Sequence, residues 1–120
     1  MSGITRRMTY IMNYSKGDIV LLSYPFTDLK SSKVRPAVVV ATENRRYSDV
    51  FVVPLTSRTE NLINGEFVLQ DWSKAGLNVV SAAKRGCVLI DTGLIKLKVG
   101  GLSKRDVSSL NKSLKLWLDL

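Results

Sequence analysis

Short apolar blocks separated by polar stretches run through most of the chain, a pattern typical of strands joined by turns. The apolar blocks are rich in Val, Ile and Leu, and Gly, Pro, Asn or Asp punctuate the stretches between them. The run 37–41 contains no polar side chain, which predicts a strand buried on both faces. The predicted strands cover residues 18–24, 37–41, 50–53, 66–69, 79–80, 87–90 and 94–99.

Three connections in this pattern carry further expectations. Pro25 and Pro54 are expected to end the strands that precede them, because proline offers no backbone donor to a ladder. Long polar loops are expected over 26–34 and 43–49. A short helical turn is expected over 70–76, with Asp71 as its N-cap and Gly76 as its end.

The pattern changes near the C-terminus, where apolar residues recur every three or four positions. This spacing predicts a helix, and residues 103–106 fit a capping box at its start. Its apolar face, expected to pack on the sheet or on a second subunit, consists of Val107, Leu110, Leu114, Trp117 and Leu118. Many short strands followed by one helix indicate a mainly β chain, a small, twisted and partly closed antiparallel barrel with a C-terminal α-helix.

Length and charge restrict the class of protein. A chain of 120 residues that is 45% apolar fits one globular domain. Its net charge of +8 favours a polyanionic partner, nucleic acid or an acidic protein, over a merely soluble basic surface. Residues 1–14 read as a leader without signal-peptide features, translated from Met1, Met8 or Met12, and 15–120 as the domain. No apolar run reaches membrane-spanning length, so a cytoplasmic protein is expected.

The chain lacks histidine and has a single cysteine, Cys87. This composition excludes a disulfide framework, a Cys/His zinc site and a His-based catalytic triad. We therefore expect neither a metal nor a cofactor. Cys87 lies in an apolar run and is most simply a buried small side chain.

Two polar sites adjoin apolar strands. Arg35 precedes Pro36, which restricts its backbone and holds a guanidinium that suits phosphate at the mouth of a strand. The hydroxyls of Thr56 and Ser57 follow the strand 50–53. Each site also has a simpler interpretation: an arginine that ends a strand in water, and a turn whose hydroxyl bonds its own backbone.

Taken in order, several segments resemble the MazF/PemK/Kid family, the endoribonuclease toxins of bacterial toxin–antitoxin pairs. The segments that carry the resemblance are KGDIV at 16–20, KVRPAVVV at 33–40, VPLTS at 53–57, ID at 90–91 and GLS at 101–103. The loop FTDL at 26–29 is similar to the PemK-like branch. Together these segments span nearly the whole chain.

The resemblance implies an SH3-like or CcdB-like barrel and a homodimer that cuts single-stranded RNA, such as mRNA, without metal. It also implies inhibition by an acidic antitoxin. The family's catalytic arginine falls on Arg35 and its catalytic threonine on Thr56. Candidate accessory residues are Ser57, Lys84 and Asp28. Candidate RNA-binding residues are Lys33, Lys30, Phe26, Arg58 and Arg85.

The expected reaction is attack of the RNA 2′-hydroxyl on the adjacent phosphorus, which gives a cyclic phosphate and a 5′-hydroxyl. In the Kid branch an arginine and an aspartate precede the Ile-Asp pair, whereas residues 81–86 here read SAAKRG. Lys84 is the candidate for the arginine, no acid stands there, and Asp28 or Glu43 is the candidate base. A second hypothesis is therefore a binding toxin, either similar to the gyrase inhibitor CcdB or a degenerate module that binds RNA or antitoxin.

Overall fold

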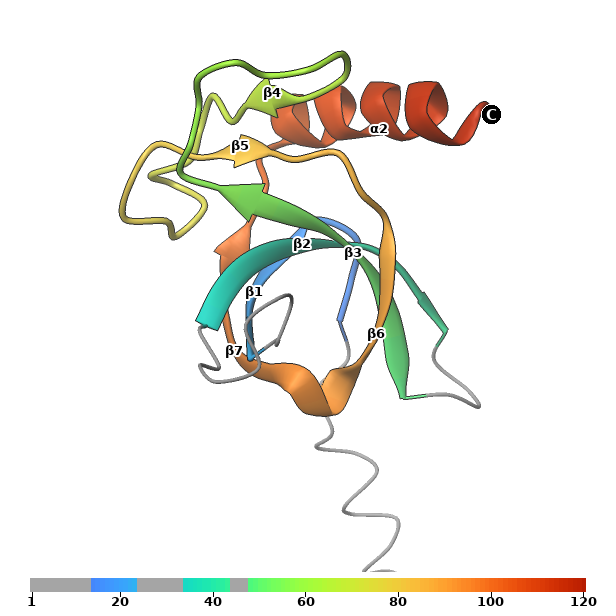
Figure 1. Ribbon diagram of the computed structural model, residues 1–120. Coiled ribbons are helices and arrows are strands. Elements are labelled where there is room, and N and C mark those ends of the chain that lie inside the picture. Colours follow the sequence, from blue (N-terminus) through green and yellow to red (C-terminus); the bar gives the residue numbers. More distant parts are fainter. Residues whose placement is uncertain (1–13, 24–33, 44–47) are drawn as a thin grey trace, which may run out of the picture.

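The computed structural model describes residues 14–23, 34–43 and 48–120, the Glu43 side chain excepted. Short strands fill most of the described chain, and one long helix follows them (Figure 1). The elements are β1 (Asp18–Ser23), β2 (Val34–Glu43), β3 (Asp49–Thr56), β4 (Phe67–Val68), β5 (Ala82–Ala83), β6 (Val88–Asp91), the 3-10 turn η1 (Thr92–Leu94), β7 (Ile95–Gly101) and α2 (Lys104–Leu118).

The strands form one antiparallel sheet that curls on itself (Figure 1). Its order is β4-β5-β3-β2-β1-β7. The edge of β3 that faces away from β2 pairs with two strands, with β6 over Asp49–Val52 and with β5 over Leu55–Thr56. No ladder joins β6 to β7 among the described strands, and η1 links these two elements in the chain. A mainly β fold with a C-terminal helix is thus confirmed, with a sheet that curls without closing.

Two hydrophobic cores lie on the two faces of this sheet. Successive side chains of a strand point to opposite faces, so neighbours such as Ile19 and Val20 enter different cores. The core under the helix contains Ile19, Val38, Val53, Leu55, Leu69, Leu110 and Leu114. The core inside the curl contains Val20, Leu22, Ala37, Val39, Val50, Val52 and Ile90. Ala37 to Val40 are all buried, so the predicted two-faced burial is confirmed for these four residues, whereas Ala41, the last of the run, is exposed.

Helix α2 begins where its sequence pattern predicts. The Ser103 side chain accepts a hydrogen bond from the Asp106 backbone N–H at 3.3 Å, which caps the first turn. Leu110 and Leu114 are buried in the core of the same chain. The helix therefore packs on the sheet, and the buried part of its apolar face is not available to a second subunit. Among the described residues, no helix is long and apolar enough to cross a membrane.

Residues 70–76 form the predicted turn, but 79–80 do not form a strand. The Ala75 N–H donates to the Asp71 carbonyl at 3.0 Å, and Gly76 has a φ of +99°. Val79 is 52% exposed and belongs to the connection between this turn and β5. A pair of valines predicts a strand only where another strand can pair with it, and here the sheet takes up the chain at Ala82 instead.

Candidate functional site

A groove opens where β2 and β3 part. Their ladder ends at the pair Ala37 and Pro54, beyond which the next residue of β2 is Pro36. Proline has no N–H to extend a ladder, so the two strands separate at this point. Pro54 does not end β3, contrary to expectation, because its carbonyl accepts the Lys84 N–H at 2.9 Å and β3 continues by pairing with β5.

The parted strands bring the two polar sites of the sequence to one place. The first residues of β2 stay paired with β1, where Arg35 lies opposite Leu22. The last residues of β3 pair with β5, where Thr56 lies opposite Ala82. Arg35 and Thr56 both line the groove, which has a volume of about 370 Å³. Ser57 and Arg58 line it as well.

The groove has the electrostatic character of a phosphate site. Arg35 and Arg58 are exposed, and neither takes part in an ion pair between described residues. No Asp or Glu occurs among the described lining residues. Two cationic side chains without a neutralising carboxylate attract anions, and the planar guanidinium can donate two parallel hydrogen bonds to phosphate oxygens.

The Thr56 hydroxyl is oriented by its own turn. Its Oγ1 accepts a hydrogen bond from the Arg58 backbone N–H at 3.1 Å, as the simpler interpretation of this site predicts. A hydroxyl oxygen that accepts this bond still carries its hydrogen. The turn therefore fixes the oxygen while Thr56 remains able to donate a hydrogen bond into the groove.

A further wall of the groove comes from the connection between the 70–76 turn and β5. Gly76, Leu77, Asn78, Val79 and Ser81 line the groove there. The sequence pattern predicts a strand at 79–80 and so gives no sign of this wall. The predicted turn at 70–76 is the feature of the sequence that indicates a connection after residue 76.

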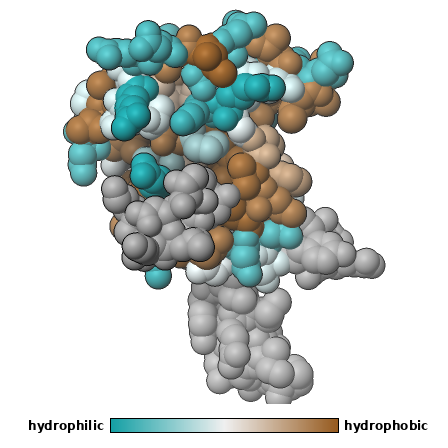
Figure 2. Space-filling model, viewed as in Figure 1, coloured by the Kyte–Doolittle hydropathy of each residue, from teal (hydrophilic) through white to brown (hydrophobic). Residues whose placement is uncertain are grey.

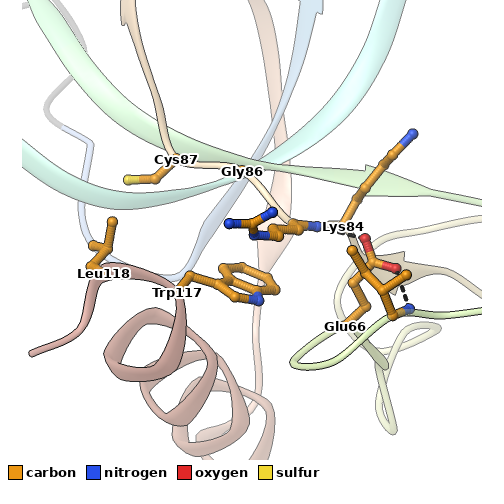
Figure 3. A pocket seen from close by; sticks show the side chains of 8 residues that line it. Glu66, Lys84, Gly86, Cys87, Trp117 and Leu118 are labelled. Atoms are coloured by element: carbon orange, nitrogen blue, oxygen red, sulfur yellow. Dashed lines mark hydrogen bonds between the residues drawn. The ribbon is translucent and has the colours of Figure 1, made fainter.

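Lys84 and Arg85 lie outside the groove, in a second cavity of about 410 Å³. Trp117 and Leu118 of α2 face Gly86 and Cys87 across this cavity, and Lys84 extends away from Trp117 (Figure 3). The structure thus does not bring Lys84 to the groove that Arg35 and Thr56 line.

Glu66 links two backbone segments that line the second cavity. Its carboxylate oxygens accept the backbone N–H groups of Ile63 at 2.9 Å and of Arg85 at 2.8 Å. The Arg85 hydrogen bond is the main cause that lowers the pKa of Glu66. Cys87 packs on the core but is only half-buried, less than the sequence predicts, and burial raises the pKa of its thiol. No three metal-ligating side chains gather anywhere in the described ranges.

The remaining candidate residues are not placed in the groove: one lies at the far end of β2, and the others lie outside the described residues. Glu43 ends β2 and lies opposite Asp49, whereas Arg35 lies near the strand's beginning. The two residues are eight steps apart along one strand, about 26 Å of chain at ~3.3 Å per step, so the expectation of Glu43 as a base beside Arg35 is wrong. Phe26, Asp28, Lys30 and Lys33 lie outside the described residues.

The fold and the groove define a class: a small curled-sheet protein with a cationic cleft suited to a polyanion. The model of the PemK-like, MazF-like toxins of type II toxin–antitoxin systems matches residues 15–118. The chain belongs to this family. No curated protein sequence matches the chain.

Solved structures show the same fold at low sequence identity. The Mycobacterium tuberculosis toxin MazF-mt6 is 19% identical with a TM-score of 0.69, over 86% of this chain and 97% of that one. A mycobacterial endoribonuclease in complex with its cognate antitoxin is 16% identical with a TM-score of 0.71, over 90% and 97%. MazE–MazF from Deinococcus radiodurans is 18% identical with a TM-score of 0.70, over 91% and 98%.

Proposed function

We propose that this toxin is an endoribonuclease that cuts single-stranded RNA, such as mRNA in the cytoplasm, in the groove between β2 and β3. The observation that carries the proposal is the convergence of Arg35 and Thr56, which come from different strands, in a groove lined by cations and no described acid. An ordinary strand end requires neither an arginine nor a threonine side chain at these positions. Family membership and neighbours named as endoribonucleases support the same activity.

In the proposed reaction the 2′-hydroxyl of the RNA attacks the adjacent phosphorus. The 2′-oxygen loses its proton, the bond to the 5′-oxygen breaks, and that oxygen takes up a proton. The products are a 2′,3′-cyclic phosphate and a 5′-hydroxyl. Arg35 stabilises the negative charge that builds on the non-bridging oxygens, and Thr56 donates one further hydrogen bond. Ser57 and Arg58 hold the neighbouring backbone of the RNA.

The proton transfers are assigned to a residue outside the described groove lining. General acid–base catalysis contributes about 10²–10⁴-fold, and the described lining residues include no group suited to it at neutral pH. We propose Asp28 as the base, and no metal ion in the reaction. The lack of a described base also favours a second candidate function, a toxin that binds RNA or another target without cutting it.

We further propose that the toxin is a homodimer inhibited by an acidic antitoxin. The net charge of +8 suits an acidic partner, and the neighbours include toxin–antitoxin complexes. For the dimer, the cross-strand pair Phe51 and Leu89 leaves apolar surface exposed, 42% and 51% respectively. Figure 2 shows hydrophobic side chains on the flank where β3 and β6 lie, and such surface is typical of subunit contacts.

The decisive experiment maps the cuts that the purified full chain makes in a long single-stranded RNA, with and without excess EDTA. We expect discrete cuts with cyclic-phosphate ends that survive EDTA. Arg35→Ala is expected to lower the cleavage rate at least about 100-fold, because it removes the main charge stabiliser. Thr56→Val is expected to lower it less while RNA binding persists.

Lys112→Ala is the matched control, since it removes one positive charge from α2, outside the groove. It is expected to cut like the wild type. A folded wild type that binds RNA but makes no cuts would support the binding toxin instead. Cuts at the wild-type rate by Arg35→Ala would contradict the mechanism.

A further inference from the structure

One wall of the groove borders the place where the proposed RNA substrate lies. This wall, residues 76–81, belongs to no strand until β5 begins at Ala82. Such a connection can vary without disturbing the sheet, and it lies beside the reacting groups. Among the described lining residues, it is therefore well placed to distinguish one RNA sequence from another.

The 70–76 turn, from which the wall continues, is held at its start by helix α2. The Asp106 carboxylate accepts the backbone N–H groups of Gln70 and Asp71, both at 2.9 Å, and Asp106 is fully buried. Arg105 donates two hydrogen bonds to the Asp71 carboxylate, at 2.7 and 2.8 Å. Helix α2 thus fixes the start of the turn that carries the wall.

Further contacts fix the rest of the wall. Gly76 packs so tightly on β7 that a Cβ there would overlap the Val99 carbonyl oxygen. Ser81 is buried, its carbonyl accepts the Leu69 N–H at 2.8 Å, and its Oγ donates to the Val79 carbonyl at 3.0 Å. A segment held at both ends presents its exposed side chains in one arrangement, as selective recognition requires.

Asn78 is the side chain of this wall that suits a nucleobase. Its amide offers both a donor and an acceptor, the combination that matches base edges, whereas the guanidinium groups of the groove suit phosphate. The backbone does not require an asparagine at 78, because its φ is not positive, in contrast to Asn61 at +58°. Asn78 is exposed and lines the groove.

Two exposed apolar side chains line the same groove as Asn78. Val34 is 49% exposed on the β2 side of the groove, and Val79 is 52% exposed on the wall. Such surfaces pack against the faces of an unstacked base, while polar groups bond its edge. Single-stranded RNA supplies bases in this splayed form.

We propose that Asn78 selects the base next to the cut phosphodiester, with Val34 and Val79 packing against that base. The inference rests on the proposed ribonuclease activity and adds the residue that sets its sequence preference. Asn78 acts as a specificity determinant and takes no part in bond breaking. Arg35 and Thr56 act on the phosphate whatever base lies beside it.

The test is cleavage of a randomised single-stranded RNA pool by the full chain, with sequencing of the cut ends. Asn78→Ala is expected to reduce the preference at one position next to the cut about tenfold or more, since a lost base contact has this effect. Preferences at other positions should remain. Asn78→Asp, which keeps the shape but loses the donor, should change which base is favoured there. Asn78→Gln should keep part of the original preference.

Asn111→Ala, an asparagine of α2 outside the groove, is the matched control. Thermal unfolding of each variant separates loss of fold from loss of selection, and Asn78→Asp decides the question where Asn78→Ala is unstable. Unchanged base preferences in folded, active Asn78 variants would overturn the inference while leaving the ribonuclease intact. A wild type that cuts nothing would instead refute the proposed function, and the base-reading role with it.

Discussion

Asp106→Asn is expected to destabilise the fold far more than its small change in shape suggests. The Asp106 side chain is fully buried at the start of α2, and its two oxygens accept the Gln70 and Asp71 N–H groups at 2.9 Å each. Asparagine fills the same space but replaces one acceptor oxygen by an NH₂ donor. One backbone N–H then faces another donor, and the remaining hydrogen bond loses its charge.

The size of the expected destabilisation follows from the two hydrogen bonds that the Asp106 carboxylate accepts. A hydrogen bond to a charged group contributes about 1.5–3 kcal/mol, and a neutral one about 1 kcal/mol. Losing one charged bond and weakening the other lowers the free energy of unfolding by about 3 kcal/mol. For a domain of this size each kcal/mol corresponds to about 4 °C, so the midpoint should fall by about 12 °C.

The assay is urea and thermal unfolding followed by circular dichroism and tryptophan fluorescence, since Trp72 lies in the turn that Asp106 holds. Asp91→Asn is the matched control. The exposed Asp91 accepts a single bond from the Gly93 N–H at 2.9 Å, which an asparagine oxygen can still accept. Its midpoint should move by less than about 2 °C. An equally small shift for Asp106→Asn would refute the view that this carboxylate holds the wall of the groove.

Two further predictions concern packing and pH. Gly100→Ala should lower the free energy of unfolding by about 2 kcal/mol or more, because a Cβ there would overlap the Ala75 carbonyl oxygen. Urea unfolding measures this change. The control is Gly101→Ala, whose Cβ would lie 3.6 Å from the Gly17 carbonyl oxygen, so its stability should stay near that of the wild type. The pKa of Glu66 is lowered in the folded state, mainly because its carboxylate accepts the Arg85 N–H. Ionised Glu66 therefore contributes fully to the free energy of unfolding above its usual pKa of 4.5, and this contribution is lost as the pH falls through the folded pKa. Glu66→Gln should therefore reduce the fall in unfolding free energy between about pH 5 and pH 3, and an unchanged pH profile would contradict this role.

Local patterns in the sequence were enough to predict most of the elements. The apolar run of β2 identifies a strand buried on both faces, and Ala37 to Val40 are buried accordingly. Spacing and a cap identify α2 in the same way, with Ser103 at its start. The same local reasoning misassigned 79–80, since two valines favour a strand without supplying a neighbour to pair with.

Roles that depend on distant partners were outside the reach of such patterns. Asp106 resembles the last residue of a capping box, yet its carboxylate bonds Gln70 and Asp71, which lie 36 and 35 residues away. The Asn78 wall depends on that contact and on the close approach of Gly76 to β7. No local spacing encodes either of these contacts, because both arise when the helix and the sheet pack.

A small basic β protein with a terminal helix could be predicted from the residues alone, as could motifs that resemble a toxin family. The sequence also singled out Arg35 and Thr56 as separate polar sites, each with a simpler interpretation. That they share one groove emerges only when the chain folds. The ladder between β2 and β3 ends at Ala37 and Pro54, because Pro36 has no N–H to extend it, so the strands part and both side chains line the opening.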